Sequence, residues 1–331
     1  MLQFYRMGLQ NFQSVQTRMI STVALVILVG IFAMSPQQLL SKSDVLGIQQ
    51  SKNTLPPKIE PIITFSEILE KPQEIPVKHP DVSDVSVYAE SAIVIDEKTL
   101  TPLFAKNPLL LQYPASTTKL ATALIALQTY ELSQTLTVPS NIREQSDGSS
   151  AQLLPMDVLT VKDLIYALLV GSANDAAYTL AINDPSGGYN NFISNMNQLA
   201  KNLNLSSTHF TNPIGYDEST HVTSAFDLAV LTQFALKEPF IRTIVDQTSY
   251  TFTSVSNPSK TYTVTTTNQL LGTVEGVTGV KTGWTPLAQG LLIVSVTRND
   301  HTIIIVIANS PYRENDAKDL IEWTYRSYVW E

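Results

Sequence analysis

The stretch Tyr113-Pro114-Ala115-Ser116-Thr117-Thr118-Lys119-Leu120 opens an almost wholly apolar run that continues to Leu127. Pro114 has no N–H to donate and disfavours helical dihedral angles in the residue before it, so a helix should not extend upstream. We therefore predict a buried helix whose first turn carries Ser116 and Lys119. Residues three apart on a helix point the same way, which places a hydroxyl beside an amine.

This serine and lysine form a candidate catalytic pair. Desolvation in an apolar setting would lower the pKa of the Lys119 amine and make it a proton acceptor for the Ser116 hydroxyl. A surface serine and lysine at chance spacing would give the same short pattern. Whether other motifs in the chain supply further catalytic residues must decide between the two interpretations.

Composition excludes several classes of function. The 331 residues are 44% hydrophobic and 15% charged, and allow one large domain or two small ones. The net charge of -8 argues against a nucleic-acid partner. The absence of cysteine rules out disulfides, thiolate nucleophiles and Cys-ligated zinc, and the four histidines are scattered without ligand spacing. We expect neither a metal nor another cofactor.

The N-terminal region predicts a membrane anchor. Residues 1–18 contain Arg6 and Arg18 and no acid, and residues 19–34 are apolar except for two hydroxyl side chains. This run is near the short end of a membrane span, and a cleaved signal peptide has the same layout. The only candidate cleavage site, at residues 33–36, is weak, and this favours an uncleaved signal anchor over a cleaved signal peptide. The basic residues before this run then predict that residues 1–18 are cytoplasmic. Residues 19–34 would cross the lipid bilayer of the cell membrane once, and the rest of the chain would be extracytoplasmic.

A linker and one folded region follow the apolar run. Residues 35–84 contain seven prolines and many Gln, Ser and Lys, which predicts a Pro-rich linker. One globular domain is predicted to occupy residues 85–331. Its expected strands lie near its two ends, at residues 87–89, 92–95, 103–105, 277–284, 291–296 and 302–307.

Helices dominate the middle of this region. Thr160 and Asp163 resemble a capping box that starts a helix through Val170, Ser224 opens a further helix, and residues 314–330 predict a closing amphipathic helix. Residues 250–265 predict two more strands. The simplest arrangement is α+β: one antiparallel sheet made from both chain ends, flanked by helices, with a mostly helical insertion.

Three short motifs stand in settings that fit together. Ser116-x-x-Lys119 starts a helix, Ser172-x-Asn174 lies on a loop between two helices, and Lys281-Thr282-Gly283 lies on a strand. Each is weak alone, but their order is typical of the penicillin-recognising serine acyltransferases, the penicillin-binding proteins and serine β-lactamases. This similarity implies a β-lactamase/transpeptidase-like fold.

A closer resemblance is to the D-alanyl-D-alanine carboxypeptidases, the low-molecular-mass penicillin-binding proteins. It covers about residues 85–331. The stretches that carry it are residues 114–119, 172–177, 210–215, 223–229 and 279–285. The middle motif, often S-G-N in the family, is S-A-N here. His221 and Asp227 fall in these stretches; we interpret His221 as structural or near the cleft and Asp227 as a helix-capping residue.

The resemblance implies catalytic roles for three side chains. Ser116 would attack the carbonyl between the two terminal D-alanines and become an acyl ester. Lys119, if neutral, would take its proton, although the identity of the base is disputed in this superfamily. Ser172 would relay the proton to the leaving amine.

Substrate-binding roles follow from the same resemblance. Asn174 would hydrogen-bond the substrate amide and position Lys119, while Lys281 and Thr282 would bind the C-terminal carboxylate. Gly283 would let the substrate backbone approach the strand edge. Backbone N–H groups of Ser116 and Trp284 would form the oxyanion hole.

The implied function is a membrane-anchored serine-type carboxypeptidase. Its partners would be peptidoglycan stem peptides ending in D-Ala-D-Ala, with β-lactam antibiotics as covalent inhibitors. A DD-endopeptidase uses the same machinery and stays open. A class A β-lactamase is disfavoured because no E-x-x-L-N occurs between Asn174 and Lys281. A non-catalytic sensor of β-lactams or cell wall is disfavoured by the intact motifs.

Overall fold

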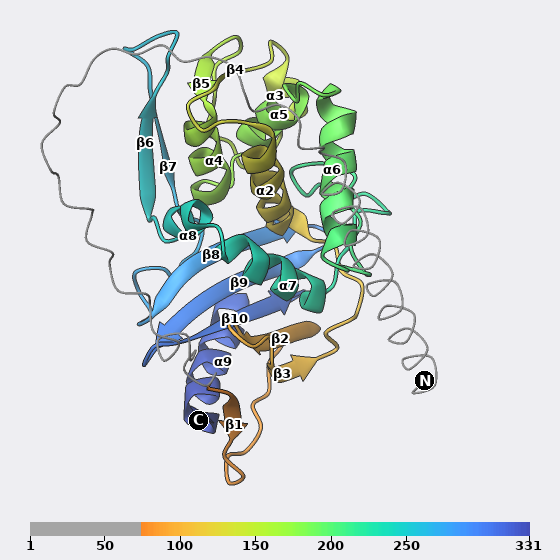
Figure 1. Ribbon diagram of the computed structural model, residues 1–331, viewed down its shortest axis with the longest axis vertical. Coiled ribbons are helices and arrows are strands. Elements are labelled where there is room, and N and C mark those ends of the chain that lie inside the picture. The colour runs from red at the N-terminus through yellow and green to blue at the C-terminus, as the bar shows by residue number, and fades with distance from the viewer. Residues whose placement is uncertain (1–73) are drawn as a thin grey trace, which may run out of the picture. The chain divides into compact units, whose positions relative to one another are not determined.

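The computed structural model describes residues 74–331. The predicted segments 1–18 and 19–34, and most of the predicted linker, lie outside the described residues. The described chain contains a five-stranded antiparallel sheet (Figure 1). Its strands, in spatial order, are β3 (Pro102–Lys106), β2 (Ser91–Asp96), β10 (His301–Ala308), β9 (Gln289–Arg298) and β8 (Val277–Thr285). The prediction of one sheet built from both ends of the domain, within an α+β fold, is confirmed.

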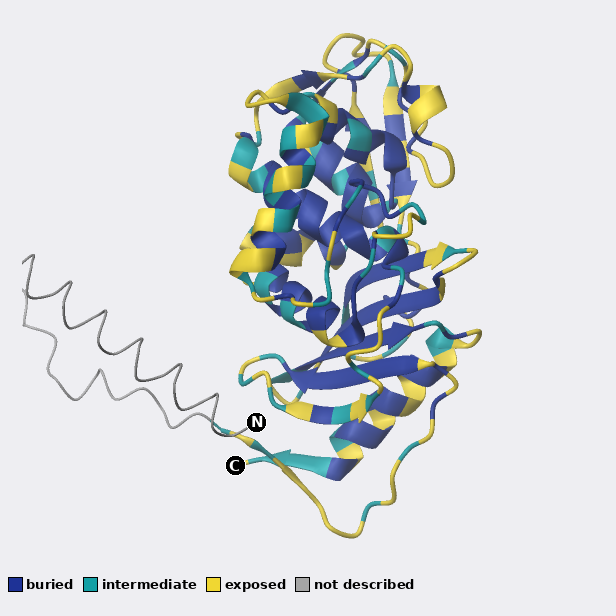
Figure 2. Cartoon of the chain, turned by 90° about the vertical axis from the view of Figure 1, so that its right-hand side faces the viewer, coloured by how far each residue is buried: buried dark blue, intermediate teal, exposed yellow. Residues whose placement is uncertain are grey.

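The central strands are buried on both faces. All six residues of β2 are buried, and so are residues 303–308 of β10 (Figure 2). Because side chains alternate between the faces of a strand, Ile304 and Val306 pack toward the helical region, whereas Ile303 and Ile305 pack toward the closing helix. The sheet therefore forms the middle layer between two apolar cores.

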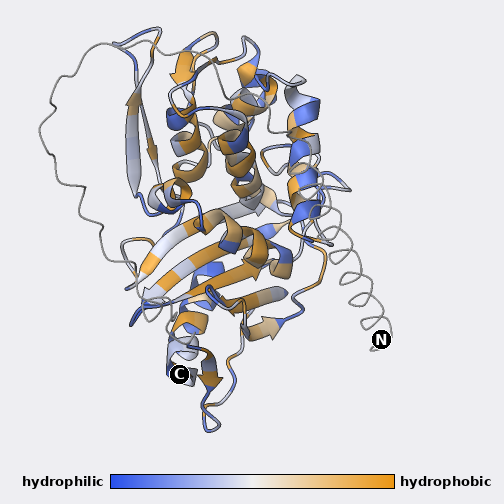
Figure 3. Cartoon of the chain, in the orientation of Figure 1, coloured by the Kyte–Doolittle hydropathy of each residue, from blue (hydrophilic) through white to orange (hydrophobic). Residues whose placement is uncertain are grey.

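The helical insertion is organised around α2 (Lys119–Thr129). Every residue from Lys119 to Ala126 is buried, which explains its nearly uniform apolar composition. Around it pack helices α4, α5, α6 and α7, with bounds Val161–Val170, Asn174–Ile182, Gly188–Asn202 and Ala225–Leu236. Helix α6 is hydrophilic on its outer side (Figure 3) and buries only Phe192, Met196, Leu199 and Ala200. Their spacing is that of a single helical stripe.

The shorter elements border this insertion. Strands β4 (Thr135–Thr137) and β5 (Val158–Thr160) form one pair, and β6 (Ser249–Thr253) and β7 (Thr261–Thr265) form the hairpin that the sequence predicted. The remaining helices are α3 (Ile142–Gln145), α8 (Pro239–Val245) and α9 (Arg313–Ser327). Within residues 74–331, no helix is long and apolar enough to cross a membrane.

Two boundary predictions were wrong. Residues 76–78 fall in the predicted linker, but they form strand β1 (Pro76–Lys78), which pairs with β11 (Tyr328–Trp330). The closing helix therefore ends at Ser327 rather than at residue 330. Such a short pairing between distant segments has no local periodicity that a sequence could reveal.

One predicted strand is absent. Residues 87–89 were expected to pair in the sheet, but they have no strand conformation. The N–H groups of Tyr88 and Ala89 instead donate to the carboxylate of Asp316, at 2.8 and 2.9 Å. A buried carboxylate on α9 thus replaces a neighbouring strand as the acceptor.

Candidate active site

Ser116 lies on a 3₁₀ turn that precedes α2. The turn, η2, spans Ala115–Thr118, so the predicted helix begins later than expected, at Lys119. Ala115 adopts a φ of +46°, in the left-handed region. A Cβ on Gly215 would lie 1.7 Å from the carbonyl oxygen of Ala115, so only glycine permits this close packing. The turn thereby aims Ser116 toward a cavity while Lys119 stays buried.

The Lys119 amine lies directly behind the Ser116 hydroxyl. Lys119 Nζ is 2.8 Å from Ser116 Oγ and also donates to the carbonyl oxygen of Ile214 at 2.8 Å. Burial lowers the pKa of the Lys119 amine well below its usual value, and the charge of Lys281 lowers it further. A neutral amine in this position can accept the serine proton.

A second serine–lysine pair faces the first. Helix α4 ends at Val170, and the following loop holds Ser172 at a φ of +57°. Ser172 Oγ accepts a hydrogen bond of 2.8 Å from Lys281 Nζ, which reaches over from β8. Burial lowers the pKa of the Lys281 amine to about 7, with the charge of Arg313 as the second cause.

Asn174 begins α5 on the far side of the same loop. Its side-chain amide donates to the carbonyl oxygen of Asp147, and its backbone N–H donates to the Ser149 carbonyl oxygen at 2.7 Å. Its Oδ1 atom is buried without a hydrogen-bond partner. The predicted contact that would position Lys119 is made by Ile214 instead, and Asn174 keeps a free acceptor.

The edge strand β8 forms the opposite wall. The side chain of Thr282 contacts the hydroxyl of Thr267, and the Trp284 ring is exposed. A Cβ on Gly283 would lie 3.0 Å from the Ala115 Cβ and 3.2 Å from the Ser116 nitrogen. Gly283 therefore lets η2 pack against β8. The prediction from sequence had explained this glycine only by the approach of the substrate backbone.

Six of the eight predicted site residues line one cavity of about 800 Å³. They are Ser116, Ser172, Asn174, Thr282, Gly283 and Trp284. Lys119 and Lys281 are buried behind the two serines that they contact. The structure therefore brings all eight together. No group of three or more His, Asp or Glu residues in the described part of the chain could hold a metal ion.

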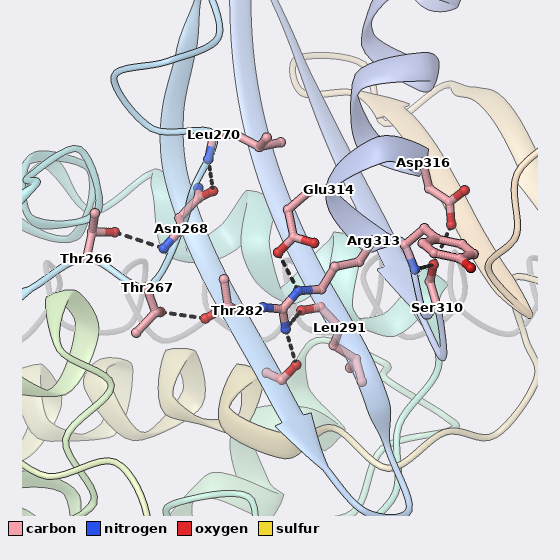
Figure 4. Close-up of polar contacts among 12 residues, drawn as sticks. Thr266, Thr267, Asn268, Leu270, Thr282, Leu291, Ser310, Arg313, Glu314 and Asp316 are labelled. Carbon is pink, nitrogen blue, oxygen red and sulfur yellow. Dashed lines mark hydrogen bonds and ion pairs between the residues drawn. The ribbon is translucent and has the colours of Figure 1, made fainter.

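Sequence reasoning missed Arg313, the first residue of α9. Its guanidinium donates to the carbonyl oxygens of Gly283 and Leu291, at 2.8 and 3.2 Å, and pairs with Glu314 (Figure 4). Arg313 also lines the cavity, beside Thr267 and Thr282. It adds a positive charge to this part of the cavity wall. No spacing rule connects it with the three motifs, because only the fold brings α9 to β8.

The interpretation of His221 as a structural residue agrees with its contacts. His221 Nδ1 accepts from the Thr211 N–H at 2.9 Å, so the ring proton sits on Nε2, which donates to Thr118 Oγ1 at 2.9 Å. Burial lowers the pKa of the imidazole to about 3, which keeps it neutral.

The predicted capping role of Asp227 was wrong. The cap of α7 is the Ser224 hydroxyl, which accepts from the Asp227 N–H. The Asp227 carboxylate instead accepts from the Ser207 N–H and the Thr208 hydroxyl, each at 2.8 Å. It therefore ties the start of α7 to the loop after α6.

Comparison with known proteins bears on the same residues. The model of the D-alanyl-D-alanine carboxypeptidase family, peptidase S11, matches residues 77–311. The chain belongs to this family. The matched range includes all three motifs, as the resemblance implied.

Two curated relatives and one crystal structure illustrate the similarity. The chain is 30% identical to D-alanyl-D-alanine carboxypeptidase DacF of Bacillus subtilis, over 74% of this chain and 64% of that relative. It is 32% identical to the D-alanyl-D-alanine carboxypeptidase of Streptomyces sp. strain K15, over 75% of this chain and 89% of that relative. The crystal structure of the Streptomyces K15 DD-transpeptidase superimposes with a TM-score of 0.71 at 30% identity, covering 74% of this chain and all of that one. The predicted fold class is confirmed.

Proposed function

We propose that this protein is a serine-type D-alanyl-D-alanine carboxypeptidase that removes the terminal D-alanine from peptidoglycan stem peptides. One observation carries the proposal: the buried Lys119 amine lies 2.8 Å from Ser116 Oγ, on the wall of a cavity large enough for a peptide end. Family membership supports the same chemistry. The catalytic unit in this proposal is the domain predicted at residues 85–331, extended to include β1.

Substrate binding is proposed to begin with its terminal carboxylate. Thr282 and Thr267 offer hydroxyl groups, and Arg313 supplies a charge beside them. Lys281 contributes its charge from behind Ser172, because its amine does not itself line the cavity. The unpartnered Oδ1 of Asn174 is placed to accept an amide N–H of the substrate. A buried acceptor without a partner is costly, and a bound peptide relieves that cost.

Acylation follows from the paired side chains. Neutral Lys119 accepts the Ser116 proton as Ser116 Oγ bonds to the carbonyl carbon of the penultimate residue. The Ser116 and Trp284 N–H groups stabilise the negative charge that develops on the carbonyl oxygen. Ser172 relays this proton from Lys119 to the leaving nitrogen, so that Ser172 keeps its hydroxyl and Lys119 returns to the neutral form; the peptide bond breaks, and D-alanine departs. Water then hydrolyses the ester, which releases the shortened peptide and restores the Ser116 hydroxyl.

β-Lactam antibiotics are proposed to enter by the same route. Their ring amide takes the place of the scissile peptide bond, and their carboxylate occupies the Thr282 end of the cavity. The leaving nitrogen stays tethered to the acyl group after ring opening. Ser116 therefore remains blocked until water reaches the ester.

The proposal includes a membrane anchor formed by residues 19–34, with residues 1–18 cytoplasmic and the catalytic domain extracytoplasmic. The apolar run and the basic residues before it support this topology. The Pro-rich linker after it would let the domain reach the cell wall. An outside location matches the proposed substrate, which is part of the wall.

The test is release of D-alanine from a peptide that ends in D-Ala-D-Ala. The full-length protein should release one equivalent per peptide, and its Ser116→Ala variant should release none. Release by both proteins would contradict the assignment of Ser116. Rapid penicillin hydrolysis without D-alanine release would favour a β-lactamase, and cleavage only of cross-linked peptides would favour an endopeptidase.

A further inference from the structure

Helix α5 leads from the active site to a second cavity. Asn174, Tyr178 and Ile182 are spaced four residues apart and therefore share one face of this helix. Asn174 lines the active-site cavity, whereas Tyr178 and Ile182 line a separate cavity of about 380 Å³. At a rise of about 1.5 Å per residue, this face runs about 12 Å from Asn174 to Ile182.

The second cavity, here called the tyrosine cavity, has aromatic and aliphatic walls with a polar rim. The rings of Tyr178 and Tyr189 stack with centroids 5.7 Å apart and an interplanar angle of 18°. Ile142 and Ile182 extend the apolar wall, and Ile182 is 45% exposed. The exposed amides of Asn141 and Gln145 stand at the edge. Burial raises the pKa of both tyrosine hydroxyls, so they remain neutral.

A third cavity shares wall residues with both the active-site cavity and the tyrosine cavity. Its volume is about 320 Å³. It shares Asp147 and Gly148 with the active-site cavity and Ile142 with the tyrosine cavity. The loop that carries Asp147 and Gly148 therefore borders the route that a ligand would follow from Ser116 toward the tyrosine cavity. An extended peptide advances about 3.3–3.6 Å per residue, so three or four residues span the length of α5.

We propose that the tyrosine cavity binds a sugar ring of the glycan strand that carries the stem peptide. This inference rests on the proposed function, because the substrate peptide of that function is attached to such a strand. A pyranose ring presents C–H groups that pack on aromatic side chains and polar groups around its edge. The walls and rim of the tyrosine cavity match these two kinds of surface, and apolar walls with a few polar groups are typical of small-molecule sites.

The test compares two ligands that differ only in the sugar. One is a free stem peptide ending in D-Ala-D-Ala, and the other is the same peptide linked to an N-acetylated amino sugar. Calorimetry on the full-length Ser116→Ala protein measures binding without turnover. We expect the sugar-bearing peptide to bind about tenfold more tightly, a gain in the range of one good apolar contact. Equal affinity for the two ligands would overturn the proposal.

Variants then locate the sugar. In the Ser116→Ala background, Tyr189→Ala should abolish the advantage of the sugar and leave binding of the free peptide unchanged. Gln145→Ala, an exposed change at the rim, should reduce the advantage without affecting the fold. Tyr88→Ala is the matched control, since Tyr88 is 73% exposed and lies beside Tyr312, outside all three cavities.

The outcomes separate this inference from the proposed function. If Tyr189→Ala weakens both ligands equally, the ring supports the active site and the sugar assignment is wrong. If the sugar-bearing peptide binds more tightly than the free peptide and this difference depends on Tyr189, the inference holds. It holds even when the parent protein, with Ser116 intact, releases no D-alanine. That last result would contradict the carboxypeptidase proposal alone.

Discussion

Lys281 Nζ on β8 donates a 2.8 Å hydrogen bond to Ser172 Oγ on the loop between α4 and α5. Both side chains are buried, but only Ser172 lines the active-site cavity. The bond therefore joins the sheet to the helical region at the point where the two meet in the site. It also holds an ionisable amine in a buried position, where the charged form is unfavourable.

The buried Lys281 amine should make stability depend on pH. Its pKa is about 7 in the folded protein against an ordinary value of 10.5 in the unfolded chain. Between these values the unfolded chain binds the extra proton, so the free energy of unfolding rises with pH across this window. The penalty is complete below about pH 7 and absent above about pH 10.5.

Replacement of Lys281 by methionine tests the direction of this pH dependence of stability. Lys281→Met should be as stable as the parent or more stable at pH 7, because it removes an unfavourable buried charge. The stability of the variant relative to the parent should then decline toward pH 10. Urea titrations at several pH values measure the difference, and a difference independent of pH would contradict the assignment.

His221 should hold the groups that position Lys119. Its ring connects Thr118, the residue before Lys119, with Thr211 in the loop that supplies the Ile214 acceptor. We expect His221→Gln to lower the free energy of unfolding by about 2 kcal/mol, the usual cost of unsatisfied buried groups. Penicillin acylation should slow about tenfold.

His209→Gln is the matched control for that variant. The His209 ring is hydrogen-bonded to the Thr220 carbonyl oxygen, at the protein surface. Stopped-flow acylation and urea unfolding compare the two variants. Equal effects at both positions would refute a positioning role for His221.

Gly283→Ala should damage the site without unfolding the domain. The new Cβ would press on Ala115 and on the Ser116 nitrogen, so η2 must move by a few tenths of an ångström. Displacement of a nucleophile on this scale costs roughly tenfold or more in rate. Penicillin acylation kinetics, with circular dichroism to confirm the fold, measure the effect. An unchanged rate would show that the contact between η2 and β8 does not matter for reactivity.

Deletion of residues 1–34 should release the protein from membranes. The proposed span is the apolar run at residues 19–34. The truncated protein should appear in the soluble fraction and still bind labelled penicillin, whereas the full-length protein should sediment with membranes. A truncated protein that still sediments would show that the anchor lies elsewhere.

Features with a strong local signal were predictable from the sequence. Thr160 caps the start of α4 as predicted, since its hydroxyl accepts from the Asp163 N–H at 3.1 Å. The β9–β10 hairpin forms around its short polar turn. Ser172 lies on an inter-helix loop and Lys281 on a strand, as expected, whereas Ser116 lies on the turn just before its predicted helix.

Features that depend on distant contacts were not predictable. The β1–β11 pair, the capture of residues 88 and 89 by Asp316, and the reach of Arg313 to Gly283 all join segments more than 29 residues apart. Each contact is fixed by how the layers pack. Neither propensity nor spacing encodes it, so the role of Arg313 could not be read from its neighbours.

The most direct test of the account is to trap the acyl group. The full-length protein is mixed with a peptide ending in D-Ala-D-Ala, quenched with acid within milliseconds to seconds, digested, and analysed by mass spectrometry. The account predicts an ester on the fragment that contains Ser116, formed together with free D-alanine and absent in Ser116→Ala. An acyl group on another residue would contradict it. So would release of D-alanine with no detectable ester, if the parent protein and Lys119→Met both behaved in this way.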